Sequence, residues 1–361
     1  MEAADERLPV SLLTGFLGSG KSTLLSKLLR RDDMDRTAVV VNEFGEVGLD
    51  HALIAHSSEN TVLLSSGCLC CTVRSDMVDT LRDLYLKRAR QEVPEFQRVV
   101  IETTGLADPA PILHTLMSDP LIAARYRLDG VVTTVDAVNG WATLDKQMES
   151  VKQAAVADRI LLTKTDIADP LRAAALTERL RRLNPAAPIV PAAHGEVAPD
   201  RLFGAGLFDP KRKTVDVQAW LNAEAYAGQA AHAHGHNHDH DHGKPDVNRH
   251  DDRVGAFCLF VDEPFDWDRL AYWLDLLAAY RGEDLLRIKG LINVKGEDRP
   301  VAIHGVQNLF HPPAQLEAWP DDDRRSRIVF ITRDLDRATI EETLRTVVSG
   351  ANAGESANAN G

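Results

Sequence analysis

The segment GFLGSGKST, Gly15 to Thr23, constrains the fold more than any other part of the chain. It satisfies the pattern G-x-x-x-x-G-K-[ST], follows the apolar run PVSLLTG and precedes the helical pattern STLLSKLLR. Between a strand and a helix, small residues let backbone N–H groups close around phosphates, and the helix N-terminus adds favourable charge. The residues expected to hold the nucleotide phosphates are Gly15, Gly18, Ser19, Gly20, Lys21, Ser22 and Thr23. A glycine-rich turn is the alternative, but this context favours nucleotide binding, with Lys21 on the outer phosphates and the Ser22 hydroxyl on Mg²⁺.

The region around this loop alternates short apolar runs with helical patterns, from Pro9 to Pro191. The runs are PVSLLTG, TAVVVNEF, TVLLSSG, RVVIETTG, DGVVTTVDA, DRILLTKTD and PIVPAAHG. Several are β-branched and apolar without strict alternation, which is typical of strands buried on both faces of a parallel sheet. Between them, DMVDTLRDLYLKRAR places its apolar residues on one helical face. We therefore predict an α/β phosphate-loop domain over residues 8–223, with a mostly parallel sheet covered by helices.

The remainder of the chain divides into three parts. Residues 224–252 contain AYAGQAAHAHGHNHDHDHGKPDVNRHDD, which cannot build a core, and predict a His-rich disordered linker. Residues 253–349 predict a smaller α+β domain: a strand and a helix in GAFCLFVDEPFDWDRLAYWLDLLAAY, strands in LLRIKGLINVKG, PVAIHGVQNLF and RRSRIVFITRDL, and a closing helix in RATIEETLRTVV. Residues 350–361 predict a disordered tail.

Charge and hydropathy narrow the class of protein. Acidic residues outnumber basic ones by 54 to 41, a formal net charge of −13, which argues against nucleic-acid or anionic-membrane partners. The N-terminus MEAADERLPV lacks an apolar segment, and no apolar run reaches about 18 residues, so we expect a cytoplasmic protein. Thiols are kept reduced in that compartment, so clustered cysteines indicate metal or redox chemistry.

The tetrapeptide TKTD, Thr163 to Asp166, suggests which base is bound. The carboxylate of Asp166 can accept two hydrogen bonds from the N1–H and amino groups of guanine, a donor pair that adenine lacks. The stem of Lys164 can pack over the purine. The same residues could simply cap a helix, but their place after the strand DRILL favours GTP over ATP.

Two further strand ends carry candidate switches. In RVVIETTG, Glu102 can hold Mg²⁺ through water, and the amide of Gly105 can sense the γ-phosphate. With Lys21 these are the predicted catalytic residues. The segment NEFGEVGLD is a candidate first switch, with Glu46 or Asp50 near the metal.

Three of the four cysteines, Cys68, Cys70 and Cys71, lie together in SSGCLCC, between an apolar run and an amphipathic helix. A helix N-terminus lowers a thiol pKa and favours thiolate, hence a metal such as Zn²⁺ or Cu(I). Three thiolates leave a fourth position open, which suits a metal that must later leave, with a carboxylate or water completing the shell. A redox thiol pair is the alternative. The fourth cysteine, Cys258 in AFCLF, is expected to be a core thiol.

The tract HAHGHNHDHDH places histidines at alternate positions, namely His232, His234, His236, His238, His240 and His242. Such a tract can collect Zn²⁺, Ni²⁺ or Co²⁺ at many weak sites, the alternative being a solvated linker.

Together, GFLGSGKST, NEFGEVGLD, GCLCC, ETTG and TKTD resemble the CobW-like GTPases, the family of the cobalamin-biosynthesis protein CobW and the zinc chaperones. The resemblance implies a GTPase that binds zinc at the C-x-C-C motif and transfers it to client metalloenzymes, driven by GTP hydrolysis. Matched position by position, it implies phosphate and Mg²⁺ contacts from Gly18 to Thr23, second-switch residues Glu102 and Gly105, guanine contacts Lys164 and Asp166, metal ligands Cys68, Cys70 and Cys71, and an acidic first-switch residue Glu46. The chain departs from the family pattern at Thr163, where many relatives have Asn, and at Val41, where some have an acidic residue.

Two other classes of function remain open from the sequence: a passive metal buffer built on a nucleotide-binding fold, and a phosphate-loop kinase or ATPase with redox cysteines. Zinc is the expected metal, with cobalt and nickel as alternatives, and a homo-oligomer is compatible with this interpretation.

Overall fold

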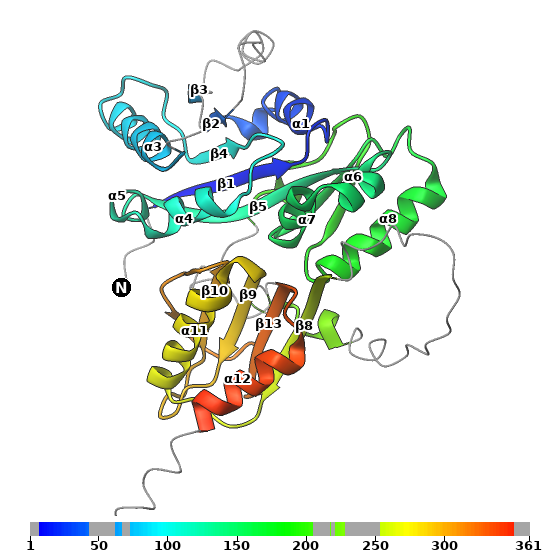
Figure 1. Cartoon of the computed structure of the whole chain (residues 1–361). Coiled ribbons are helices and arrows are strands. Elements are labelled where there is room, and N and C mark those ends of the chain that lie inside the picture. Colours follow the sequence, from blue (N-terminus) through cyan, green and yellow to red (C-terminus); the bar gives the residue numbers. More distant parts are fainter. Residues whose placement is uncertain are drawn as a thin grey trace, which may run out of the picture. The chain divides into compact units, whose positions relative to one another are not determined.

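The computed structural model describes residues 7–42, 62–66, 73–204, 217, 221–227 and 253–349. The chain forms two compact units, the first within residues 1–207 except for Arg182–Ala186, and the second from Phe208 onward together with that short segment (Figure 1). In the described part of the chain, no helix has both the length and the apolar character that crossing a membrane requires.

The first unit contains a parallel sheet, as the buried apolar runs predicted. Its strands, in the order β3-β2-β4-β1-β5-β6-β7, pair only in parallel. They are β1 (Leu8–Gly15), β2 (Thr37–Asn42), β3 (Val62–Ser66), β4 (Arg98–Glu102), β5 (Tyr126–Asp136), β6 (Arg159–Thr163) and β7 (Ile189–Ala192). The strand that leads into the phosphate loop, β1, therefore lies at the centre of the sheet, between β4 and β5 (Figure 1).

Helices cover both faces of this sheet. They are α1 (Lys21–Leu28), α3 (Val73–Ala89), α4 (Ala110–Ser118), α5 (Pro120–Ala123), α6 (Gly140–Lys146), α7 (Met148–Ala155) and α8 (Pro170–Leu183), with 3-10 turns η1 (Asp32–Met34) and η2 (Pro199–Arg201). The leucines of α1 pack in one buried cluster with Val132 of β5. The next residue, Thr133, donates a hydrogen bond to the Gln153 carbonyl of α7 at 2.7 Å. Since successive strand residues point to opposite faces, α1 and α7 cover opposite faces of the sheet.

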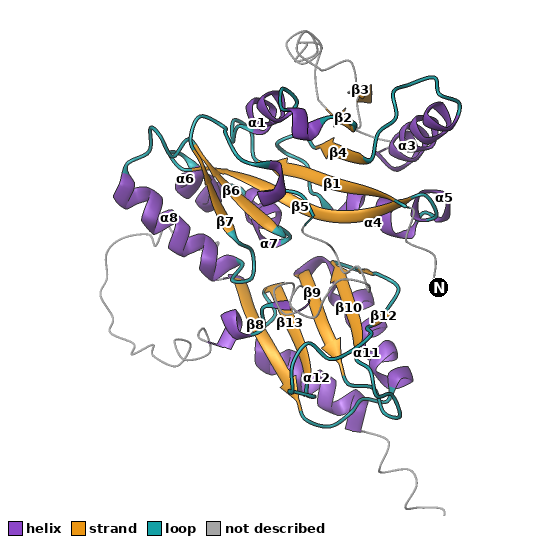
Figure 2. Cartoon of the chain, turned by 180° about the vertical axis from the view of Figure 1, so that it is seen from behind, coloured by secondary structure: helices purple, strands orange, loops and turns teal. Residues whose placement is uncertain are grey.

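The second unit is an antiparallel sheet covered by two helices (Figure 2). Its strands run in the order β11-β10-β9-β13-β8, with β12 also paired to β10. They are β8 (Val254–Val261), β9 (Leu285–Ile292), β10 (Val301–Val306), β11 (Leu309–Phe310), β12 (Ala314–Gln315) and β13 (Ser326–Arg333); the helices are α11 (Trp267–Arg281) and α12 (Arg337–Ser349), with the 3-10 turn η4 (Gly282–Asp284). The sequence predicted the long strands and both helices, but not the two-residue strands β11 and β12.

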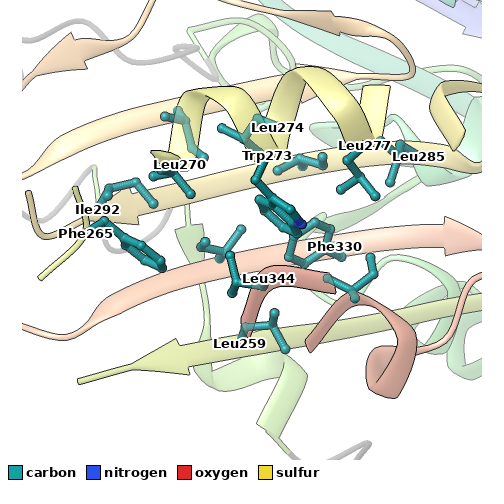
Figure 3. Packing of buried hydrophobic residues seen from close by; sticks show 14 of the residues in the cluster. Leu259, Phe265, Leu270, Trp273, Leu274, Leu277, Leu285, Ile292, Phe330 and Leu344 are labelled. Atoms are coloured by element: carbon teal, nitrogen blue, oxygen red, sulfur yellow. The ribbon is translucent and has the colours of Figure 1, made fainter. Parts of the chain in front are cut away.

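The core of the second unit lies between the sheet and the two helices. Trp273 of α11 points toward Phe330 of β13, with ring centroids 6.3 Å apart in an edge-to-face arrangement (Figure 3). The indole N–H of Trp273 also donates to the Thr343 hydroxyl of α12 at 3.2 Å. One side chain thus connects both helices with the sheet.

The start of the predicted linker differs from expectation. Residues Glu224–Ala227 form the short helix α10, which contacts β8, and Tyr226 is only 2% exposed. These residues, with Leu221 and Ala223, belong to the second compact unit. An alanine-rich segment beside a histidine tract carries no helical period from which this packing could be read. Residues 228–252 and 350–361 lie outside the described residues.

Candidate nucleotide site at the carboxyl edge of the parallel sheet

The phosphate loop joins β1 to α1 and folds tightly on itself. The backbone N–H of Ser19 donates to the Phe16 carbonyl at 3.1 Å. Only glycine fits at Gly15, because its φ is +140° and a Cβ atom would lie 2.2 Å from Thr134 Oγ1. The glycines of the motif therefore follow from the backbone path, with Gly18 and Gly20 also at positive φ.

Lys21 is drawn into this loop. Its side chain is buried, and Nζ donates to the carbonyls of Gly15 at 2.7 Å and Phe16 at 3.2 Å. A lysine cation at the N-terminal end of α1 adds to the positive partial charge of that helix end. The arrangement favours an anion such as a phosphate group at the loop.

Ser22 and Glu102 lie together although 80 positions separate them. The parallel register of β1 and β4 pairs Leu13 with Glu102, which brings the end of β4 beside the phosphate loop. The Ser22 hydroxyl donates to Glu102 Oε1 at 2.8 Å, and the Glu102 side chain is 4% exposed. A hydroxyl and a carboxylate are hard oxygen ligands of the kind that Mg²⁺ prefers. The residues predicted for the magnesium ion therefore fit it chemically.

The loop after β4, residues 103–108, lies against the phosphate loop. The backbone N–H of Thr103 donates to the Leu13 carbonyl, and its hydroxyl donates to Thr14 Oγ1, both at 2.9 Å. A Cβ atom at Gly105 would lie 2.5 Å from the backbone nitrogen of Leu17, so this approach is open only to glycine. The predicted second-switch residues Glu102 and Gly105 are thus both next to the phosphate loop.

Thr163 connects the predicted base loop to the phosphate loop. Its hydroxyl donates to the Ser19 carbonyl at 2.7 Å and contacts the Val135 carbonyl at 3.2 Å. The side chain is buried, so this bridge is shielded from water. Thr163 therefore forms a polar link between the two loops.

Asp166 lies at the same edge, and a nitrogen of His194, in the loop after β7, contacts each of its carboxylate oxygens. The backbone N–H of His194 donates to Oδ1 at 2.9 Å, and the ring Nδ1 lies 3.1 Å from Oδ2. The backbone hydrogen bond from His194 lowers the pKa of the Asp166 carboxyl. Asp166 is therefore ionised and oriented, as an acceptor of paired N–H donors must be.

The neighbouring Lys164 has a left-handed backbone, φ +57°, and its Nζ contacts Asp136 Oδ2 at 2.7 Å. Burial opposes ionisation of Asp136, but hydrogen bonds from Lys164, Asn139 and two backbone N–H groups outweigh it and lower the pKa of this carboxyl. Asp136 thus fixes the lysine stem beside the base loop.

Sequence reasoning missed Asp136 and His194 as members of this site. Each follows an apolar run, DGVVTTVDA and PIVPAAHG, and so stands where a parallel strand ends. The carboxyl ends of such strands meet at one edge of the sheet, which is a signal that could have identified both residues.

The predicted metal-binding residues Cys68, Cys70, Cys71 and Glu46, Asp50 and the six alternating histidines lie outside the described residues. The strands that lead to them are described: β2 and β3 pair in parallel, with Asn42 opposite Ser66. The candidate first switch and the cysteine segment therefore both begin at the edge that carries the phosphate loop. Within the described ranges, no group of three His, Cys, Asp or Glu residues could hold a metal ion.

Cys258 of β8 is a core thiol, as predicted: it is 3% exposed, and burial raises its pKa to about 12. At pH 8 almost all such thiols are therefore un-ionised, and the thiolate is the reactive form. We expect a thiol reagent such as iodoacetamide to label at most three of the four cysteines of the native chain at pH 8, and the fourth only after unfolding. Peptide mass spectrometry would check this, and rapid labelling of native Cys258 would contradict it.

Comparison with known proteins agrees with this geometry. Residues 9–191 match the family described as CobW/HypB/UreG, nucleotide-binding domain, and residues 254–348 match the cobalamin synthesis protein cobW C-terminal domain. The chain belongs to the CobW/HypB/UreG family. The resemblance inferred from the five motifs is thereby confirmed, and the α/β fold with a smaller α+β domain is confirmed as well.

Individual members of the family match this chain over nearly its whole length. The zinc chaperone YjiA of Escherichia coli is 33% identical, covering 95% of this chain and 98% of its own. The zinc-regulated GTPase metalloprotein activator 1 of Saccharomyces cerevisiae is 27% identical, covering 94% and 83%. A crystal structure of Zn(II)-bound YjiA GTPase from E. coli superposes with a TM-score of 0.70 at 29% identity, covering 94% and 99%.

Proposed function

We propose that the chain is a cytoplasmic GTP-hydrolysing metallochaperone, which binds zinc at its C-x-C-C motif and transfers it to client metalloproteins, with the nucleotide state coupled to zinc affinity. One observation carries the nucleotide part. Lys21, the Ser22–Glu102 pair and Asp166 come from three separate strand ends and meet at one edge of a single parallel sheet.

The phosphates of GTP would lie in the loop of residues 15–20, with Lys21 leaving the carbonyls of Gly15 and Phe16 for the outer phosphates. Ser22 would hold Mg²⁺, with Glu102 as its hydrogen-bonded acidic partner. The ion would supply neutralisation of the charge that develops on the phosphates. Gly105, packed against the phosphate loop, would offer its N–H toward the γ-phosphate.

Guanine would bind along Asp166 and the Lys164 stem. Asp166 already accepts a backbone N–H, and a carboxylate retains lone pairs for the N1–H and amino donors of guanine. Lys164 is held by Asp136, so its carbon stem is available as an apolar surface for the purine.

The zinc part rests on the family and on the order of the segments. Two relatives that match 95% of this chain are named zinc chaperones, and the C-x-C-C motif follows β3, in sequence, at the nucleotide edge of the sheet. Cys68, Cys70 and Cys71 would bind zinc as cargo, while the histidine tract would supply weaker collecting sites. A client metalloprotein, rather than nucleic acid or a membrane, would receive the ion.

Asp166→Ala tests the base assignment. Wild-type protein is expected to hydrolyse GTP well ahead of ATP, and the variant to lose this preference, with affinity for guanine nucleotides reduced roughly ten- to a hundredfold because an ionised acceptor is removed. Initial rates with both nucleotides and calorimetric titration with GDP would measure this.

Glu178→Ala, an exposed carboxylate of α8, is the matched control and should change neither value. Equal use of ATP by the wild type would contradict the GTPase proposal, and phosphate transfer from ATP to a small molecule would favour a kinase instead.

A further inference from the structure

Two adjacent residues of α7 hold the loop that follows β4. The side-chain nitrogen Nε2 of Gln153 donates to the carbonyls of Gly105 at 3.2 Å and Ala107 at 3.0 Å. Lys152 Nζ lies 2.8 Å from Asp108 Oδ2, and Asp108 Oδ1 accepts the N–H of Ala110, where α4 begins. The loop is therefore fixed at three of its residues by groups that no sequence motif pointed to.

The chemistry of this contact requires an amide nitrogen. Both partners of Gln153 are carbonyl oxygens, which only accept hydrogen bonds, so the NH₂ end must face them. Gln153 has no exposed surface. Its backbone carbonyl accepts a hydrogen bond from the Thr133 hydroxyl of β5, which fixes α7 on the sheet. Within the described residues, the side-chain oxygen Oε1 has no hydrogen-bond partner. Donation to the loop is thus the polar role that the structure gives this side chain.

The other side of the same loop touches the phosphate loop. A Cβ atom on Gly105 would lie 2.5 Å from the Leu17 nitrogen and 2.7 Å from its Cα. The loop is therefore enclosed between Leu17 and Gln153, and the two donated hydrogen bonds keep Gly105 close to where phosphates would bind.

We propose that Gln153 is a positioning residue for the second switch: its side-chain amide holds Gly105 and Ala107 in the arrangement that receives the γ-phosphate. This inference rests on the proposed GTPase function and adds a residue to it. A group that holds Gly105 affects the triphosphate and not the diphosphate, because Gly105 would meet only the γ-phosphate. Gln153 thus contributes to the discrimination between GTP and GDP without touching either nucleotide.

The test is Gln153→Leu, which retains much of the side-chain volume and removes both donors. We expect affinity for a non-hydrolysable GTP analogue to fall about ten- to thirtyfold, the size expected for two ordinary hydrogen bonds, with GDP affinity within about twofold of wild type. The turnover number for GTP should fall as well. In the nucleotide-free protein, amide hydrogen exchange of residues 103–108 should become faster, because the loop has lost its two hydrogen bonds from Gln153 of α7.

Val151→Ala is the structural control, since Val151 is buried on the same helix and makes no polar contact with the loop. It should lower the melting temperature but leave the ratio of analogue to GDP affinity unchanged. Should Gln153→Leu fail to fold, Lys152→Met removes the partly exposed ion pair to Asp108 and is expected to shift the same ratio in the same direction by a smaller factor.

A folded Gln153→Leu protein in which the ratio of GTP-analogue affinity to GDP affinity is unchanged or raised would overturn the inference. If wild-type protein binds neither the analogue nor GDP, the GTPase proposal fails. In that case the exchange measurement still tests Gln153, because unchanged amide exchange of residues 103–108 in Gln153→Leu would show that its side chain does not hold the loop. The failure of the GTPase proposal and the failure of the positioning role are therefore distinguishable.

Discussion

Lys21→Ala is expected to lower the turnover number for GTP about 10²–10³-fold. The ammonium group lies at the loop where the phosphates are expected, and removing one preorganised group that stabilises a transition-state charge typically costs this much. The fold should be retained, because Leu17 and Gly18 of this loop are exposed, so that water can enter where the ammonium group has been removed. Steady-state phosphate release would measure the turnover number, and thermal melting would check the fold. The zinc content of the purified protein is expected to be unchanged.

Lys146→Ala is the matched control for this variant. Lys146 is an exposed lysine in the last turn of α6. Its loss should leave turnover and zinc content unchanged. Full turnover by a folded Lys21→Ala protein would remove Lys21 from the catalytic residues.

Zinc affinity is expected to differ by about 5- to 150-fold between the GTP-analogue and GDP states, a coupling of about 1–3 kcal/mol. The cysteine segment begins two residues after β3, and β3 is separated from β4, which carries Glu102, by β2 alone. Two strand spacings amount to about 10 Å, so ordering of the loops around the γ-phosphate has a short path to the thiols. By linkage, zinc must change the affinity for the analogue by the same factor.

A zinc competition titration in both nucleotide states would measure this coupling. One tight site per chain is expected, which Cys70→Ser removes and Cys258→Ala, at a buried thiol, retains. Deleting residues 231–243 should remove only weaker sites. Equal zinc affinity in both states would leave the thiols as a static site and favour the metal-buffer alternative, even if GTP hydrolysis were observed.

The fold could be predicted because its strongest determinants are local in sequence. Runs such as AVVV and VVI, buried on both faces, give a signal for parallel strands that does not depend on their neighbours. The phosphate loop could be predicted for the same reason, since the positive φ angles of Gly18 and Gly20 and the crowding at Gly15 are properties of one short segment. Lys164 and Asp166 were identified by their place at a strand end.

The groups that support these residues could not be read in this way. Gln153 lies in a helical pattern where a polar residue is expected to face solvent, yet it is fully buried because the loop after β4 passes over it. The contacts of His194 with Asp166 and of Asp136 with Lys164 form only when β5, β6 and β7 pair side by side. Such contacts depend on strand order, which no single segment of the sequence encodes.

The position of β3 in the sheet has a mechanical consequence. In the described residues β3 pairs with β2 alone, from Val62 to Ser66, whereas β1 pairs with strands on both sides. Displacing β3 disturbs one ladder of hydrogen bonds, and displacing β1 would disturb two. The phosphate loop thus follows a strand that is paired on both sides, while the cysteine segment follows, in sequence, a strand that is paired on one side in the described part of the chain. A small change of shape imposed at the centre of the sheet is therefore resisted less at β3 than at the strands that are paired on both sides.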